Sequence, residues 1–216
     1  MSQQLGMEEM IAMMRGAIQR VRDGEKMLTE FDSACGDGDH GISMGRAVAR
    51  IEQCLASTEN HDLQSTLYNL GWTILGVDGG STGPLLGSLF LGMSESTEGK
   101  AHLDVADMVR MFQAGLDAVQ KHTAAKVGDK TMMDALIPAV HVLQTGAAEG
   151  GDIPALLHGA AVAAENGAAS TKTMVARFGK AKFSAERSLG HQDAGATSLA
   201  MLFRGFYEGL LHRENG

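Results

Sequence analysis

Segment 36–41, Gly-Asp-Gly-Asp-His-Gly, combines two carboxylates with three glycines and a histidine. Asp37 and Asp39 stand two residues apart, and Asp32 precedes them by five residues or more. Carboxylates this close in a chain repel one another unless a cation lies between them. An all-oxygen donor set favours Mg²⁺ or Ca²⁺ over zinc or copper. An EF-hand loop is excluded, because Gly41 and Val48 stand where it needs an Asp or Asn and a bidentate Glu.

Mg²⁺ usually keeps few protein carboxylates and shares its coordination shell with phosphates. The acidic segment therefore predicts a Mg²⁺–phosphate site. The plainer alternative is a helix N-capping loop that happens to be rich in acidic residues.

Segment 79–83, Gly-Gly-Ser-Thr-Gly, precedes a predicted helix. Its amides and the hydroxyls of Ser81 and Thr82 are suited to phosphate oxygens at the positive end of a helix dipole. A simple turn with an N-cap explains the same residues. The segment also fits the GxSxG nucleophile elbow of α/β-hydrolases, but that motif needs a strand before Ser81, and the preceding residues have a helical pattern.

Three further segments carry polar residues between helices, and each has a structural explanation beside the functional one. In 128–134, Asp129 is expected to cap a helix, and Met132 is suited either to the core or to the face of an adenine ring. Arg177, Lys180 and Lys182 form a basic loop that could approach phosphates or simply be solvated. In 190–195, a helix cap explains Asp193 without any ligand.

Composition narrows the class of protein. The 216 residues carry a formal net charge of −8, which argues against nucleic acid as a main partner. The N-terminus lacks the basic and apolar regions of a signal peptide, and no apolar run approaches the ~18 residues that cross a bilayer. Two cysteines suggest no disulfide framework. We expect one domain over residues 1–216, in the cytoplasm, with no membrane partner.

The apolar residues recur at helical rather than strand spacing, which predicts an all-α fold of eight or nine pieces. We expect helices over residues 6–21, 25–31, 42–56, 63–75, 82–93, 104–122, 129–146, 154–173 and 196–212. If antiparallel helices alternate up and down, alternate connections emerge at the same end. The loops 32–41, 76–83, 123–132 and 177–197 should therefore share one rim and form a composite site there.

Four blocks in order closely resemble the nucleotide-binding L subunit (DhaL) of dihydroxyacetone kinases. They are Gly-Asp-Gly-Asp-His-Gly (36–41) with Asp32 upstream, Gly-Gly-Ser-Thr-Gly-Pro-Leu (79–85), Gly-Asp-Lys-Thr-Met-Met-Asp (128–134) and Ser-Leu-Gly-His-Gln-Asp-Ala-Gly-Ala-Thr-Ser (188–198). The resemblance covers almost the whole chain. It implies an eight-helix antiparallel up-and-down barrel with a nucleotide and Mg²⁺ in the loops at one rim.

The resemblance also implies roles for individual residues. Asp32, Asp37 and Asp39 would hold Mg²⁺. The residues implied to contact the nucleotide are His40, Gly41, Ser43, Ser81, Thr82, Thr123, Met132, Lys180, Asp193 and Gly195. The chain departs from the family at two of these residues and at one neighbour: Ser43 replaces a frequent Asn, Lys180 replaces a frequent Arg, and Ala194 replaces the proline of the family's Asp-Pro-Gly.

The implied function is that of an ADP- or ATP-binding kinase subunit. A separate K subunit would hold dihydroxyacetone or a related short ketose, and ADP would be rephosphorylated in place by a phosphohistidine M subunit of a phosphotransferase system. No residue of this chain is expected to act as a general base, and His40 and Lys180 would position the phosphates. An ATP-dependent subunit with exchangeable ATP and a non-catalytic nucleotide sensor remain alternatives.

Overall fold

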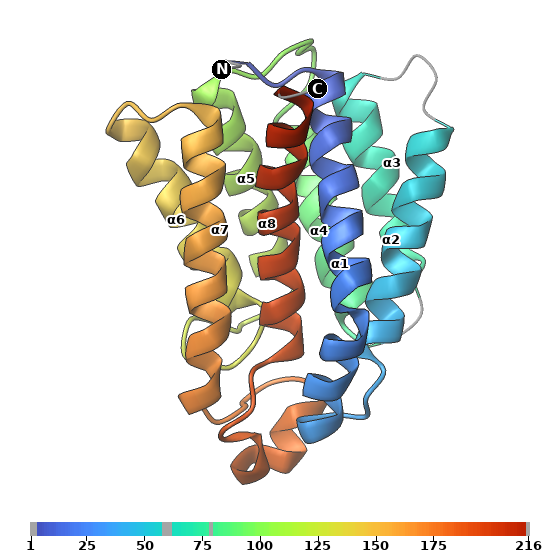
Figure 1. Cartoon of the computed structure of the whole chain (residues 1–216), viewed down its shortest axis with the longest axis vertical. Helices are drawn as coiled ribbons and strands as arrows, with labels where there is room; N and C mark the ends of the chain where they lie inside the picture. The colour runs from blue at the N-terminus through green and yellow to red at the C-terminus, as the bar shows by residue number, and fades with distance from the viewer. Residues whose placement is uncertain (1–3, 58–61, 78–79, 215–216) are drawn as a thin grey trace.

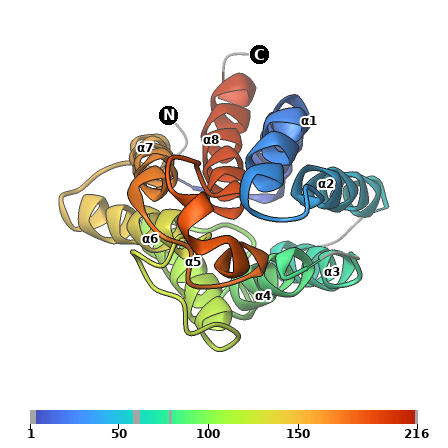
Figure 2. The same cartoon turned by 90° about the horizontal axis from the view of Figure 1, so that it is seen from below.

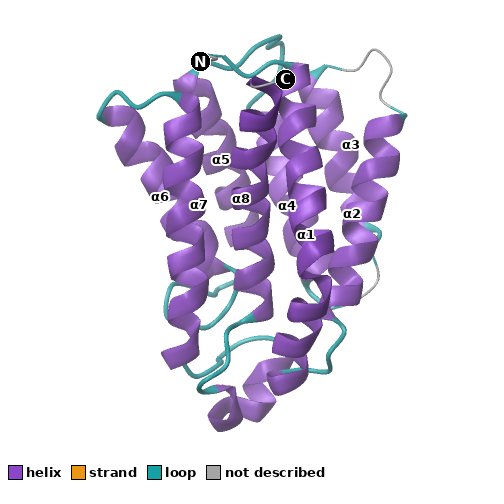
Figure 3. Cartoon of the chain, in the orientation of Figure 1, coloured by secondary structure: helices purple, strands orange, loops and turns teal. Residues whose placement is uncertain are grey.

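The computed structural model describes residues 4–57, 62–77 and 80–214. Eight α-helices run antiparallel through the described part of the chain, as Figures 1 and 3 show. Their bounds are α1 (Met7–Cys35), α2 (His40–Ala56), α3 (Leu63–Leu75), α4 (Thr82–Glu95), α5 (Val105–Gln120), α6 (Met133–Ala148), α7 (Ile153–Ser170) and α8 (Ala194–Glu214). The 3₁₀ helices η1 (Thr171–Thr173) and η2 (Lys180–Ser188) lie between α7 and α8.

The helices form a closed ring in chain order. Each packs against the next, and α8 packs against α1, so the view from below shows an up-and-down barrel (Figure 2). Leucine, methionine and phenylalanine side chains fill its interior, including Phe112 and Phe203 with ring centroids 5.4 Å apart. The expected all-α barrel is confirmed, and the described residues contain no β-strand, only an isolated bridge.

Glycines let the first and last helices meet closely. A Cβ at Gly16 would lie 2.1 Å from the Gly205 carbonyl oxygen, and one at Gly209 would lie 2.0 Å from the Ala12 carbonyl oxygen. Any side chain here would push the helix backbones apart. The glycines of α1 and α8 therefore close the ring.

The predicted break between residues 21 and 25 is wrong, because α1 continues for 29 residues to Cys35. Gly24 is not a turn residue: it is buried, and a Cβ there would meet the Met201 side chain of α8 at 2.3 Å. As a result Asp32 lies in the last turn of α1 rather than in a loop.

The alternation of the connections is confirmed by the ring. The loops after α1, α3, α5 and α7 lie together at the lower end in Figure 1, opposite the two termini. We call this end the rim. The predicted 177–197 loop is partly wrong, since η2 occupies almost half of it and α8 begins at Ala194. None of the described helices is long and apolar enough to span a membrane.

The two ends of the barrel differ in how helices begin. At the end opposite the rim, Asp62, Asp104 and Asp152 each accept a hydrogen bond from a first-turn amide, with N···O distances of 2.7, 2.8 and 3.0 Å. At the rim, the N-cap residues of α2, α4 and α6 make no side-chain cap bond. The first amides of α2 and α6 instead donate to the side chains of Asp32 and Thr131, and Asp193 caps α8, so α4 is the rim helix with the open start. Uncapped first-turn amides carry partial positive charge and are suited to anions.

Candidate active site

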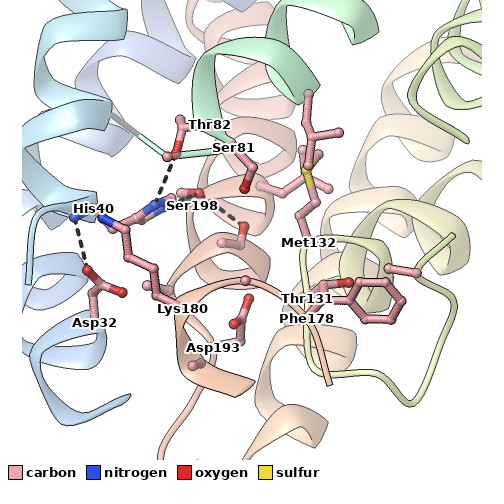
Figure 4. Close-up of a pocket in the computed structure, with 18 of the residues that line it drawn as sticks. Asp32, His40, Ser81, Thr82, Thr131, Met132, Phe178, Lys180, Asp193 and Ser198 are labelled. Atoms are coloured by element: carbon pink, nitrogen blue, oxygen red, sulfur yellow. Dashed lines mark hydrogen bonds between the residues drawn. The ribbon is translucent and has the colours of Figure 1, made fainter. Parts of the chain in front are cut away.

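A cavity of about 670 Å³ opens at the rim. Its walls come from the end of α1, the α1–α2 loop, the starts of α2 and α4, the α5–α6 loop, η2 and the start of α8. Figure 4 shows side chains from these separate elements converging on one space. The loops that loop alternation placed at one rim therefore enclose a common cavity.

The three predicted metal ligands meet at one edge of this cavity. Asp32, Asp37 and Asp39 each offer a carboxylate oxygen, and these oxygens all lie within 4.8 Å of one another. Such a hard, anionic donor set fits Mg²⁺, which leaves room for water and phosphate oxygens. The glycine at position 38 lets the loop turn, with φ of +78° between the two loop aspartates.

Lys180 of η2 reaches the same carboxylates. Its Nζ donates to Asp37, and to Asp39 Oδ2 at 3.3 Å. This hydrogen bond lowers the pKa of Asp37, and Asp37 in turn raises the pKa of Lys180. The predicted phosphate-positioning lysine and the predicted metal ligands are thus brought together, with the basic segment lying over the acidic loop.

His40 lies between two hydroxyls. Its Nδ1 is 3.3 Å from Thr82 Oγ1, and its Nε2 is 2.9 Å from Ser198 Oγ (Figure 4). Ser198 Oγ donates its own proton to the Gly195 carbonyl at 3.0 Å, so Nε2 is the donor to Ser198, and in a neutral ring Nδ1 then accepts from Thr82. Burial lowers the pKa of His40, against the opposing charges of Asp32 and Asp39, which favours this neutral ring.

That arrangement makes His40 a connector. Both ring nitrogens are used by hydroxyls of α4 and α8, while the His40 amide donates to Asp32 Oδ2 at 3.2 Å. Hydrogen bonds of this one residue therefore fix the Asp32 carboxylate relative to the starts of α4 and α8. The neutral, fully bonded ring is suited to positioning rather than to proton transfer.

The start of α4 lines one side of the cavity and is suited to an anion. Gly80, Ser81 and Thr82 line it, and Ser81 is an N-cap residue whose helix has no side-chain cap. Gly79 lies outside the described residues. The element before this loop is α3, a helix, so the strand required by a GxSxG nucleophile elbow is missing from the described chain.

The opposite wall is more apolar. Met132 and Phe178 lie across the cavity from Asp32 and His40 in Figure 4. Leu85, Leu202 and Thr123 also line the cavity, and the Thr123 hydroxyl accepts from the Ala125 amide at 3.1 Å. An apolar wall with a few polar atoms suits a nucleobase. The predicted nucleoside contacts, Thr123 and Met132, both line the cavity, and Met132 faces it across from the acidic edge in Figure 4.

A buried carboxylate shapes the loop that presents Met132. Asp134 accepts from the Gly128 amide at 2.6 Å and from the Thr131 amide at 2.7 Å. Asp129, expected to cap this helix, instead pairs with Arg177 at 3.2 Å, and α6 begins only at Met133. The predicted start at 129 is wrong because Asp134 holds the preceding residues in a turn.

Asp193 and Gly195 line the floor at the start of α8. Asp193 Oδ2 accepts from the Ala196 amide at 2.7 Å, so the expected capping role is confirmed. Burial raises the pKa of Asp193 to about 6, although the Ala196 amide and the Lys130 ammonium oppose the shift. A carboxyl group whose pKa is raised by desolvation in a cavity is typical of functional sites.

Two predicted contact residues do not line the cavity. Ser43 is buried in α2. Gly41 packs against α1, where a Cβ would lie 2.2 Å from Thr29 Oγ1 and 2.3 Å from the Glu25 carbonyl oxygen. Close helix contact is thus a sufficient physical reason for this glycine.

Several cavity residues were not among the predicted contacts, and three of them carry chemistry or an aromatic ring. Lys130, Phe178 and Ser198 all line it. Lys130 and Ser198 belong to the recognised blocks, so their position in those motifs was an available signal. Phe178 carried no signal, because an aromatic residue in a basic loop predicts nothing specific.

Residues 34–208 match the DAK2 domain. The ADP-binding subunit DhaL of the PEP-dependent dihydroxyacetone kinase of Escherichia coli is 37% identical over 177 residues, covering 82% of this chain and 84% of that subunit. The ADP-binding subunit DhaL of the PTS-dependent enzyme of Lactococcus lactis is 33% identical over 190 residues, 88% of this chain and 91% of that one.

The fold also matches a solved structure. The crystal structure of the dihydroxyacetone kinase from C. freundii in complex with AMP-PNP and Mg²⁺ has a TM-score of 0.70 and 28% identity to 91% of this chain. The match spans 33% of that longer protein. The barrel with its rim cavity is thus a DAK2-type fold. The chain belongs to the DAK2-domain family of dihydroxyacetone kinase subunits, and its named DhaL relatives are kinase components.

Proposed function

We propose that this chain is the nucleotide-binding subunit of a kinase for dihydroxyacetone or a related short ketose. One observation carries the proposal: a cluster of three carboxylates and the uncapped start of α4 line the same cavity. A cation site beside an anion site is what a Mg²⁺–nucleotide needs. The AMP-PNP and Mg²⁺ in the C. freundii relative support this reading.

In the proposed site, Asp32, Asp37 and Asp39 hold Mg²⁺, which when bound neutralises phosphate oxygens. The first-turn amides of α4 with Ser81 and Thr82 hold phosphate oxygens on the other side. Lys180 reaches the phosphates from η2. Catalysis of this kind depends on positioning and charge neutralisation more than on covalent chemistry by the protein.

The remaining predicted contact residues are assigned either to the nucleoside or to the phosphates. Thr123 and Met132 contact the nucleoside, while Asp193 and Gly195 support the phosphates from the start of α8. Gly41 and Ser43 act through the backbone of the first turn of α2, because neither residue lines the cavity. His40 positions Thr82 and Ser198.

We further propose that the ketose lies on a separate K subunit that docks at the rim. The ketose hydroxyl oxygen bonds to the transferred phosphorus as the phosphorus–oxygen bond to the β-phosphate breaks, and the hydroxyl proton passes to a base of the K subunit. A phosphohistidine M subunit then rephosphorylates the bound ADP, breaking its nitrogen–phosphorus bond. The E. coli and L. lactis relatives, described as PEP- and PTS-dependent, support this route. We place the complex in the cytoplasm.

Nucleotide content tests the proposal. The protein is purified with Mg²⁺, desalted and denatured, and its nucleotides are separated by chromatography. Near-stoichiometric ADP is expected. An empty protein that exchanges free ATP and phosphorylates ketose with a K subunit would favour the ATP-dependent alternative. Binding without transfer to any ketose would favour a sensor, and absence of binding would refute the proposal.

A further inference from the structure

Lys130 is the unusual residue of the α5–α6 loop. Its side chain is almost fully buried, at 2% exposure, yet it lines the cavity. Its φ of +60° is the one positive value at a non-glycine residue in the described chain. A bulky residue adopts this conformation at a cost in backbone strain, and such strain gathers at functional sites.

The Lys130 ammonium is committed to two backbone carbonyls. Nζ donates to the Thr171 carbonyl oxygen at 2.6 Å and to that of His191. An ammonium has three N–H donors, so these two bonds use most of its capacity. Burial lowers the pKa of Lys130, while the charges of Cys35, Asp193 and Asp134 oppose the shift.

The two carbonyls flank segment 172–190, which carries Lys180. The Gly190 amide donates to the Lys172 carbonyl at 2.8 Å and closes this segment at its base. Lys130 therefore holds together the two residues between which segment 172–190 leaves and re-enters the barrel. It belongs to the neighbouring loop, directly before Thr131 and Met132.

Thr171 extends the connection to α8. Its Oγ1 accepts from the Asp193 amide at 2.8 Å, and Asp193 caps the first turn of α8. The Met132 loop, the base of the Lys180 segment and the start of α8 are thus joined around one ammonium.

We propose that Lys130 is a positioning residue that keeps the nucleoside wall in register with the Lys180 segment and the start of α8. The inference rests on the proposed nucleotide site. Lys130 acts through the carbonyls of Thr171 and His191 rather than by contacting phosphate.

The test compares Lys130→Met with Lys126→Met in the whole chain. Methionine keeps most of the side-chain volume but leaves two carbonyls without their donor. Lys126 is an exposed lysine four residues earlier in the same loop and serves as the matched control. Two quantities are measured: the affinity for ADP with Mg²⁺ by calorimetry, and the rate of tryptic cleavage within 172–190 without nucleotide, read by mass spectrometry.

For Lys130→Met we expect ADP binding weaker by about tenfold or more and faster cleavage at Arg177, Lys180, Lys182 and Arg187. Lys126→Met should match wild type in both. If Lys130→Met melts at a lower temperature but keeps wild-type affinity and cleavage while folded, its role is only structural and the proposal is overturned.

If Lys130→Met does not fold, Thr171→Val decides. This substitution keeps the backbone carbonyl that accepts from Lys130 and removes the hydroxyl that accepts from the Asp193 amide. Weaker ADP binding supports the connection, and wild-type binding overturns it. If wild type binds no ADP, the proposed function fails, while the cleavage comparison of the unliganded proteins still decides the role of Lys130.

Discussion

Replacing Asp193 by Asn should stabilise the folded protein at neutral pH. The pKa of Asp193 rises from 3.8 to about 6 on folding because its carboxylate is desolvated at the cavity floor. A raised carboxyl pKa means that the folded protein binds the proton more tightly than the unfolded chain. Protonated Asp193 therefore stabilises the folded state relative to ionised Asp193. This stabilisation is fully present below pH 3.8 and is lost as the pH rises through 6.

The size of the effect follows from the shift. Two pKa units correspond to about 3 kcal/mol against the ionised form at pH 7.5, and about a third of that at pH 4.5. Asn caps a helix as well as Asp does and cannot ionise. Because Asp193 is partly exposed, solvent reduces the gain to about 1–2 kcal/mol. For a chain of this length that raises the unfolding midpoint by about 2–8 °C.

The assay is thermal unfolding followed by circular dichroism at pH 7.5 and pH 4.5. Asp193→Asn should melt above wild type at pH 7.5, with the difference shrinking at pH 4.5. Asp152→Asn is the matched control, since Asp152 caps α7 at the opposite end with a hydrogen bond of similar length, and it should give no such gain. A variant that melts at or below wild type at pH 7.5 refutes the argument.

Three other substitutions test the account. Gly41→Ala should lose about 1–3 kcal/mol of unfolding free energy in urea titration, because its Cβ would lie 2.2 Å from a side-chain oxygen of α1; an unchanged midpoint would show that α1 and α2 separate easily. Asp134→Ala should lose at least about 2 kcal/mol in the same assay, since two loop amides lose their acceptor, and equal stability would contradict this. Ser81 should not react with a fluorophosphonate probe. If the probe labels wild type and the Ser81→Ala substitution abolishes the labelling, the serine-hydrolase alternative is supported instead.

Apolar spacing predicted the all-α fold and loop alternation predicted the shared rim, because both are local patterns, whereas the barrel was implied by the resemblance to the DhaL family. It failed at Gly24, where a glycine among charged residues has the pattern of a helix end but packs against Met201. It also failed at Asp129, whose partner Arg177 is 48 residues away. Contacts between distant residues decide such positions, and no local pattern contains them.

The candidate site was predictable in part for the same reason. The carboxylates at 32, 37 and 39 are close in the chain, so their chemistry was visible at once. The bonds from His40 to Ser198 and from Lys130 to Thr171 cross 158 and 41 residues. These bonds connect separate loops, and only the closed ring of helices brings them together.

The most direct test of the central claim is the binding of ADP by calorimetry with Mg²⁺ and with a chelator, on wild type and Asp37→Asn. We predict tight binding by wild type with Mg²⁺ and binding at least about tenfold weaker with the chelator or in the variant. Equal ADP affinity under all of these conditions would contradict a nucleotide site built on the carboxylates of Asp32, Asp37 and Asp39.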